Sequence, residues 1–243
     1  MARFLDLMLC IFPFEAELYN KSGLRTVFVG HPMVERLRAR KLGIERDPNL
    51  IGLFPGSRRR EVRKIFPILI ETAGELHKQR ANLRFEVEAA SEALANEISD
   101  TLADAYVREG LFRVVTDETA ATMQRASLGI VASGSATLEA AYFRLAYALI
   151  YKVAWPTYLA ARLVVDVKYL GMANVLANKE VVPEFIQHRA KPSTIAKAVL
   201  QLINDPGARD RMISEFDQIV AKLGEGGASE KAARAILEEL GAS

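Results

Sequence analysis

The chain has few of the residues that build disulfide bonds, metal sites and membrane spans. It contains one cysteine, Cys10, and three histidines among 243 residues, so it offers neither an internal disulfide nor a cluster of metal ligands. No apolar run reaches the about 18 residues that a membrane-spanning helix needs. The apolar start MARFLDLMLCIFPFE contains Asp6 and lacks a small-residue cleavage site, which argues against a signal peptide. We therefore expect a cytoplasmic protein without a metal site.

An excess of charge of one sign is also absent. The formal net charge is +2 although 26% of the residues are charged, so there is no global basic field of the kind that binds nucleic acid. We expect no nucleic-acid partner. Hydrophobic residues make up 50% of the chain, which is typical of a soluble globular protein with enough apolar material for a core.

Short apolar runs alternate with longer amphipathic segments. Strands are predicted at residues 7–11, 26–29, 50–54, 84–89, 112–116, 128–132 and 147–151. Helices are predicted after Ser57 as far as Leu76, and at residues 91–109, 119–125, 136–142, 156–164, 192–204, 207–223 and 230–240. The helix after Ser57 is the clearest, because its apolar residues recur at the helical spacing. The alternation predicts an α/β fold with a Rossmann-like parallel sheet and helices on both faces.

The chain is expected to have two parts. Residues 1–40 contain only about one β-α-β unit, and the polar, turn-rich segment RARKLGIERDPN that overlaps their end is typical of a linker. A new α/β domain is expected within residues 41–243, with its first strand at Leu50. One β-α-β unit cannot cover both faces of its own sheet, so residues 1–40 either join the following sheet or belong to another domain.

The first motif with chemical content is FPGSRRREVRK, which predicts a strand end, a Pro-Gly turn and the first turn of a helix. Its three consecutive arginines oppose the positive end of the helix dipole unless an anion is bound there. Gly56 allows the backbone to approach such an anion, and Arg58 is suited to bidentate phosphate binding. The alternative is a solvated basic turn with Ser57 as an ordinary N-cap. Arg59 and Arg60 are expected to be solvated.

The second motif is IVASGSATLEAAYF. A buried strand leads into the turn Ser133-Gly134-Ser135, and the helix after it carries Thr137 and Glu139. Hydroxyl and N–H groups in such a turn suit phosphate, and a carboxylate suits ribose or sugar hydroxyls, so the motif favours a nucleotide sugar. It is neither GxGxxG nor a P-loop, since no lysine follows. The alternative is helix capping by Ser133 or Ser135, with Glu139 placed to favour the dipole.

The third motif, GMANVLANKEVVPEFIQ, has little periodicity and is predicted to be a loop. Its amides and carboxylates favour either a loop that binds sugar and ribose hydroxyls or a cluster of turns. Between the second and third motifs, Trp155, Tyr158 and Leu159 mix with the cations Lys152 and Arg162. This mixture is typical either of a patch that touches membrane or acyl chains or of a partly buried helix with snorkelling cations.

The front segment LCIFPFEAELYNKSGLRTVFVGHPM and the motifs FPGSRRREVRKIFP, ASGSATLEAA and NVLANKEVVPEFIQ together closely resemble the lipid-A-disaccharide synthases. The resemblance covers nearly the whole chain, and the combination of motifs makes it specific. It implies a GT-B glycosyltransferase with two Rossmann-like domains facing across a cleft. The implied reaction transfers diacylglucosamine from UDP-2,3-diacylglucosamine to 2,3-diacylglucosamine 1-phosphate (lipid X), releases UDP and needs neither metal ion nor cofactor.

The resemblance also implies roles for particular residues. Gly56, Ser57 and Arg58 would hold the diphosphate. The other UDP-sugar contacts would come from Ser133, Gly134, Ser135, Thr137, Glu139, Lys152, Asn174 and Glu180. The carboxylate that deprotonates the attacking hydroxyl is expected in the family's N-terminal domain, of which residues 1–40 resemble only the final β-α-β unit. We therefore expect the donor-binding half of an enzyme, inactive without a separate N-terminal-half chain, at the cytoplasmic face of the inner membrane.

The third motif departs from the family pattern at two places. The family's Leu-Pro-Asn is Met172-Ala173-Asn174 here. Because alanine replaces proline, we expect the loop to be looser. Ala-Gly-Arg-Glu is Ala177-Asn178-Lys179-Glu180, and the change from arginine to lysine removes any bidentate contact. Two alternative functions stay open at this point: another UDP-sugar GT-B transferase or epimerase, and a non-catalytic nucleotide-binding or assembly module.

Overall fold

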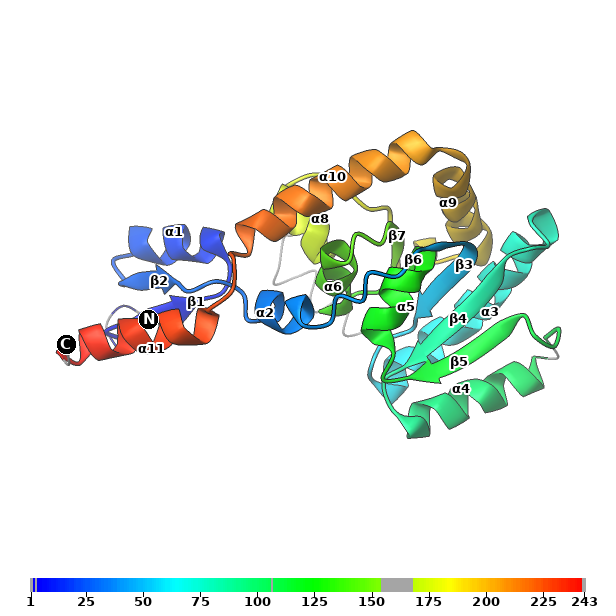
Figure 1. Cartoon of the computed structure of the whole chain (residues 1–243), viewed down its shortest axis with the longest axis horizontal. Helices are drawn as coiled ribbons and strands as arrows, with labels where there is room; N and C mark the ends of the chain where they lie inside the picture. Colours follow the sequence, from blue (N-terminus) through cyan, green and yellow to red (C-terminus); the bar gives the residue numbers. More distant parts are fainter. Residues whose placement is uncertain (1, 3, 106, 154–167, 242–243) are drawn as a thin grey trace. The chain divides into compact units, whose positions relative to one another are not determined.

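The computed structural model describes residues 2, 4–105, 107–153 and 168–241 of the chain (Figure 1). The chain forms two compact units. One consists of Met1–Arg40 together with Asp217–Ser243, and the other of Lys41–Phe216. One boundary between the units falls between residues 40 and 41. Residues 217–243 group with the first unit, so the second unit is shorter than the expected domain of residues 41–243.

The larger unit is built on a six-stranded parallel sheet, of which β3, β4 and β5 are clearly visible in Figure 1. Its strands, in the order of the sheet, are β5 (Phe112–Thr116), β4 (Arg84–Ala89), β3 (Asp47–Phe54), β6 (Ala126–Ala132), β7 (Tyr147–Tyr151) and β8 (Glu184–Ile186). The chain runs outward from β3 through β4 and β5 and then returns to the other side of β3 as β6. Because crossovers between parallel strands are right-handed, the helices after β3 and after β6 cover opposite faces. The predicted α/β class is confirmed.

The described helices of this unit are α3 (Arg59–Gln79), α4 (Glu92–Asp104), α5 (Thr119–Arg125), α6 (Ala136–Tyr142), α8 (Met172–Ala177), α9 (Pro192–Asn204) and most of α10 (Pro206–Lys222), with a 3-10 turn η1 (Gln187–Arg189). The periodic apolar face of α3, which includes Val62, Phe66 and Leu69, is buried. The helix α3 contacts α4 and α9. The core between the helices and the sheet contains the fully buried Leu53 and Ile130. None of the described helices is long and apolar enough to cross a bilayer.

The smaller unit contains two parallel strands, β1 (Met8–Cys10) and β2 (Thr26–Phe28), and the helices α1 (Pro13–Lys21), α2 (Met33–Arg38) and α11 (Ala228–Glu239). The side chain of Asn20 donates to the carbonyl of Thr26 at 3.0 Å and accepts from its N–H at 2.9 Å. These two bonds hold the end of α1 beside the start of β2. The N–H of His31 donates to the carbonyl of Leu223 at 2.8 Å, which ties the C-terminal residues to this unit.

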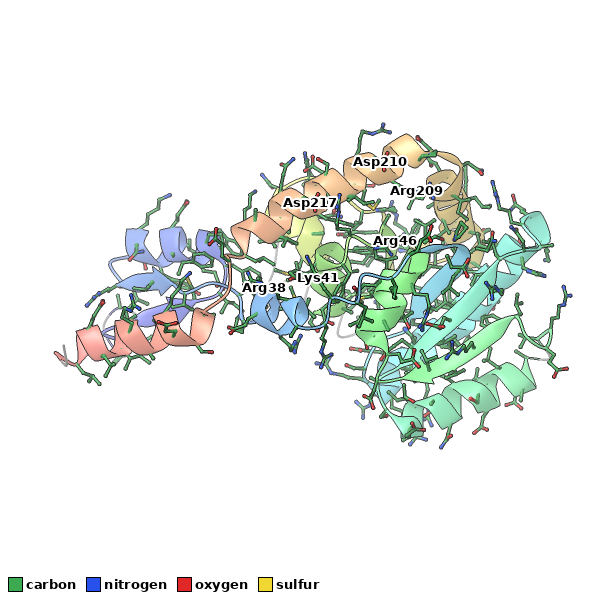
Figure 2. The ribbon with its side chains drawn as sticks, viewed as in Figure 1. Arg38, Lys41, Arg46, Arg209, Asp210 and Asp217 are labelled. Carbon is green, nitrogen blue, oxygen red and sulfur yellow. The ribbon has the colours of Figure 1, made fainter. Side chains whose placement is uncertain are left out.

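Arg46 fixes the segment that enters β3, and Figure 2 labels its side chain. The guanidinium donates to the carbonyl oxygens of Met123, Ala126 and Phe143 at 2.9, 2.5 and 2.5 Å. These carbonyls lie at the ends of α5 and α6, where helices leave acceptors without partners. Burial lowers the pKa of Arg46, and Arg144 contributes to the same shift. One side chain therefore joins two helix ends to the start of the central strand.

Most predicted elements are confirmed, and the strands at 84–89, 112–116 and 147–151 have the predicted limits. The prediction of a loop at residues 171–187 is wrong, because this segment contains α8 and β8. Both elements are too short to show a period. β8 forms because it completes the sheet beside β7, where the N–H of Leu149 donates to the carbonyl of Pro183 at 2.9 Å. The predicted helix at 156–164 and the aromatic side chains near it lie outside the described residues.

Candidate functional site

A cavity of about 270 Å³ lies at the carboxyl ends of β3 and β6, between the turns that follow these strands. The strand order reverses between β3 and β6. Open α/β sheets bind their ligands at this kind of position, because the turns diverge there and leave a crevice. The predicted site residues that line the cavity are Gly56, Ser57, Arg58, Ser133, Gly134, Ser135 and Glu139. The structure therefore brings the first two motifs together, although more than seventy residues separate them in the chain.

The turn after β3 needs glycine at position 56. Gly56 has φ +107°, and a Cβ added there would lie 2.9 Å from a carboxylate oxygen of Glu61. The helix α3 then begins with Arg58 as its N-cap residue, in an extended conformation and without a side-chain cap. The alternative that Ser57 is an ordinary N-cap is therefore wrong. The first N–H groups of a 21-residue helix stay available to an anion at the cavity.

Arg58 and Arg59 have different partners. Nη1 of Arg58 lies 2.8 Å from Oε1 of Glu61, and the Arg58 side chain is 81% exposed. Arg59 donates to Glu97 of α4 at 2.6 Å, and Arg63 pairs with the same carboxylate. These two guanidinium groups lower the pKa of Glu97, with Arg63 as the larger cause. Arg59 is thus engaged in an exposed ion pair away from the cavity, and Arg58 is the arginine that lines it.

The turn after β6 is held by the backbone and by Thr137. The N–H of Ser133 donates to the carbonyl of Ile150 at 3.0 Å, and Thr137 Oγ1 donates to the carbonyl of Gly134 at 2.7 Å. Thr137 is fully buried and does not line the cavity. Its hydroxyl stabilises the turn from the side of the protein interior. Ser135 is the N-cap residue of α6 but makes no side-chain cap bond. The hydroxyl-rich turn thus faces the cavity, while the capping alternative has no support at Ser135.

The cavity has an acidic side that sequence reasoning missed. Glu88, near the end of β4, lines it and is only 8% exposed. Oε1 of Glu88 accepts a hydrogen bond from Thr119 Oγ1 at 2.5 Å. The pKa of Glu88 is raised mainly by burial, and the nearby carboxylates of Asp117 and Glu139 raise it further. In the sequence, Glu88 alternates with apolar neighbours like any solvent-facing strand residue, so only the fold reveals its position.

Asn174 is part of the scaffold of the third motif and lies outside the cavity. It is fully buried, and its Nδ2 donates to the carbonyl of Val182 and to Oε1 of Glu184, both at 2.8 Å. Its Oδ1 accepts from the N–H groups of Val181 and Val182 at 2.7 and 2.9 Å. Both N–H groups and both oxygen lone pairs of this amide are thereby used inside the protein. The amide closes the segment between α8 and β8.

The two departures in the third motif have structural explanations. Ala173 is buried in the first turn of α8, where alanine is a good helix former, so the expected loosening of a loop is wrong. Asn178 ends α8 in the left-handed conformation (φ +52°), which asparagine tolerates almost as well as glycine. Lys179 pairs with Glu215 of α10 at 2.8 Å. Lys152 follows β7 half-buried, Glu180 is exposed, and neither lines the cavity.

Solved structures with the same fold include two in which a uridine nucleotide is bound. The fold is similar to that of S. aureus MnaA in a structure with UDP, with a TM-score of 0.69 at 11% identity over 100% of this chain and 63% of that chain. The Neisseria meningitidis UDP-GlcNAc 2-epimerase bound to UDP-GlcNAc has a TM-score of 0.63 at 12% identity, covering 98% of this chain and 62% of that chain. At such identities the likeness shows the fold alone, that of GT-B glycosyltransferases and related epimerases.

Sequence comparisons point to a single family. The family model described as lipid-A-disaccharide synthetase matches residues 1–237. The lipid-A-disaccharide synthase of Geobacter sulfurreducens is 34% identical in an alignment of 250 positions that covers 99% of this chain and 64% of the relative. Lipid-A-disaccharide synthase 1 of Legionella pneumophila is 35% identical over 90% of this chain and 58% of the relative. The chain spans less than two thirds of the length of these relatives, and it belongs to the lipid-A-disaccharide synthetase family.

Proposed function

We propose that this chain is the donor-binding half of a lipid-A-disaccharide synthase and binds UDP-2,3-diacylglucosamine in the cavity between the turns after β3 and β6. The observation that carries the proposal is the position of Arg58 and of the uncapped start of α3 at the point where the strand order reverses. A guanidinium and free helix N–H groups attract the same chemical group, a phosphate or diphosphate. The family membership supports UDP-2,3-diacylglucosamine as the nucleotide sugar.

The diphosphate would lie along the turn Gly56-Ser57-Arg58, with the turn Ser133-Gly134-Ser135 on its other side. Glu139 would accept hydrogen bonds from hydroxyl groups of ribose or sugar. As the bond to the sugar breaks, negative charge grows on the departing UDP. Arg58 and the N–H groups of α3 would stabilise this charge, which lowers the barrier for the transfer.

The acceptor in this proposal is lipid X, 2,3-diacylglucosamine 1-phosphate, whose hydroxyl attacks the sugar carbon from the side opposite to UDP. The carboxylate that removes the proton of this hydroxyl would come from the part of the relatives that the chain does not span. A separate chain that carries this part is the partner that we propose. Because both substrates carry acyl chains, we place the reaction at the cytoplasmic face of the inner membrane.

Calorimetric titration of these 243 residues with UDP tests the proposal. We expect UDP to bind, Arg58→Ala to weaken binding about tenfold or more, and Arg60→Ala to leave it unchanged. Arg60 is the matched control, since it is exposed, stands two residues further on and does not line the cavity. Equal losses in the two variants, or UDP binding that neither substitution affects, would contradict the proposed site.

Two substrates separate this proposal from the alternatives. A lipid-A-disaccharide synthase half should bind UDP-2,3-diacylglucosamine more tightly than UDP-GlcNAc, whereas another UDP-sugar transferase or epimerase should prefer the unacylated nucleotide. A module retained only for assembly should bind neither. We expect no transfer to lipid X by these 243 residues alone and transfer after addition of the N-terminal half of a relative. Turnover without that half would contradict the assignment of the base to another chain.

A further inference from the structure

We infer that Glu88, positioned by Thr119, is a specificity-determining residue at the nucleoside end of the cavity, where its carboxylate accepts a hydrogen bond from a base N–H or a ribose hydroxyl of the bound nucleotide. The inference rests on the proposed function, because it names a further contact of the same site. Glu88 lies on β4, outside all three motifs that carry the family resemblance.

The layout of the cavity favours one orientation of a bound nucleotide. The turns after β3 and β6 carry Arg58 and the hydroxyl-rich backbone turn, so this end suits phosphate. Glu88 and Thr119 line the same cavity from β4 and from the start of α5, on the side of β3 away from β6. If the phosphates of a nucleoside diphosphate lie at the Arg58 end, its ribose and base lie at the Glu88 end. The acidic end repels phosphate and therefore favours this orientation over the reverse one.

The Glu88 carboxylate has room for a further hydrogen-bond donor. Glu88 is more than nine-tenths buried and lines the cavity, and Thr119 donates to Oε1 at 2.5 Å. Among the described residues, no hydrogen bond to Oε2 is found. Burial together with Asp117 and Glu139 raises the pKa of Glu88, as expected for a carboxylate with too few donors around it. A ligand N–H or O–H would supply the missing donor.

Carboxylates in a cavity commonly bind a metal ion. No group of three or more acidic, histidine or cysteine side chains with metal-binding geometry exists in the part of the chain that the structure describes. A single oxygen held by a threonine hydroxyl is instead the arrangement of a hydrogen-bond acceptor with a fixed direction. Thr119 fixes the plane of the carboxylate and leaves the second oxygen for the ligand.

The test compares nucleotides that lack one donor each. Calorimetry would measure UDP, N3-methyl-UDP, 2′-deoxy-UDP, 3′-deoxy-UDP and inorganic pyrophosphate on the wild-type chain, Glu88→Ala, Glu88→Gln and Thr119→Val. We expect Glu88→Ala to weaken UDP binding about tenfold and to leave pyrophosphate binding unchanged or stronger. On the wild-type chain, one of the modified nucleotides should bind about tenfold more weakly than UDP. On Glu88→Ala, the same nucleotide and UDP should bind equally tightly. That nucleotide identifies base or ribose as the source of the donor.

The control variant is Glu92→Gln. Glu92 also accepts a hydrogen bond from a threonine, Thr116 at 2.8 Å, but it is exposed and does not line the cavity. If UDP binds the wild-type chain and Glu88→Ala binds it equally well, the inference is wrong and the proposed function stands. Equal losses for UDP and pyrophosphate would also overturn it, because they indicate a disturbed fold rather than a lost contact. If the wild-type chain binds neither UDP nor pyrophosphate, the proposed function and this inference both fail.

Discussion

Nη1 of Arg58 lies 2.8 Å from Oε1 of Glu61, one turn further along α3. The arginine that lines the cavity is thus already paired with a carboxylate that lines it too. A diphosphate that binds there would compete with Glu61 for the guanidinium of Arg58. The negative charge of Glu61 would also repel the diphosphate. The pair keeps Arg58 in place and also limits how tightly an anion binds.

Replacement of Glu61 by glutamine should strengthen the binding of pyrophosphate and of UDP. The loss of one charge pair near the surface is worth about 1 kcal/mol, so we expect an increase in affinity of about threefold to tenfold. Glu75→Gln in the same helix is the control, because Glu75 pairs with Lys78 at the same spacing outside the cavity. Weaker anion binding by Glu61→Gln would show that the position of Arg58 depends on the pair.

Replacement of Asn174 by alanine should destabilise the larger unit. The substitution leaves the half-buried N–H of Val181 and the buried N–H of Val182 without their acceptor and removes the donor to Glu184. We expect the free energy of unfolding to fall by about 2–4 kcal/mol in urea denaturation, because each buried group without a partner costs about 1–3 kcal/mol.

The exposed Asn204, which bonds Arg80 at the surface, provides the control Asn204→Ala. Its effect should stay within about 0.5 kcal/mol. UDP affinity of Asn174→Ala, measured well below its unfolding transition, should match the wild-type value, since Asn174 does not line the cavity. A stable variant with lost UDP affinity would contradict the structural role and favour the role in donor binding that the sequence suggests.

Arg46 should matter for stability more than its place in a linker-like segment suggests. Arg46→Ala removes three hydrogen bonds to carbonyls at the ends of α5 and α6. We expect a loss of about 2–4 kcal/mol in the free energy of unfolding, and Arg46→Lys should restore only part of it because an ammonium cannot span three carbonyls. Arg84→Ala, which breaks an exposed pair with Asp47, should cost less than about 1 kcal/mol.

The raised pKa of Glu88 predicts a pH dependence of stability. Burial, Asp117 and Glu139 make the folded protein hold the Glu88 proton more tightly than the unfolded chain does, while the Thr119 hydroxyl opposes the shift. The folded state therefore binds more protons between the unfolded and the folded pKa, and stability falls as the pH rises through that window. Glu88→Gln has no proton to lose.

The thermal midpoint of Glu88→Gln should therefore be close to the wild-type value at about pH 4 and higher than it at about pH 8. Glu92→Gln, at an exposed glutamate, should show no such change with pH. The measurement is a series of thermal unfolding curves between these pH values. A wild-type chain that gains stability relative to Glu88→Gln as the pH rises would show that the environment of Glu88 favours its charged form.

Sequence patterns determined the regular part of this protein. The strand at 84–89 and the helix α3 were predictable because burial of one face imposes a period on the residues that form it. The glycine turn at Gly56 was also predictable, since a Pro-Gly pair between a strand and a helix is typical of a tight turn. Such features depend on neighbours along the chain.

Tertiary structure decided which side chains meet. The Asn174 amide is typical of a ligand-binding side chain. Once α8 and β8 form, however, it is hydrogen-bonded to Val181, Val182 and Glu184 and stabilises the fold. Glu88 resembles an exposed strand residue until the fold places Thr119, 31 positions later, against it. Local sequence specifies the backbone through period and turn chemistry, whereas burial and hydrogen bonding of a polar side chain depend on residues that are close only in the folded sheet.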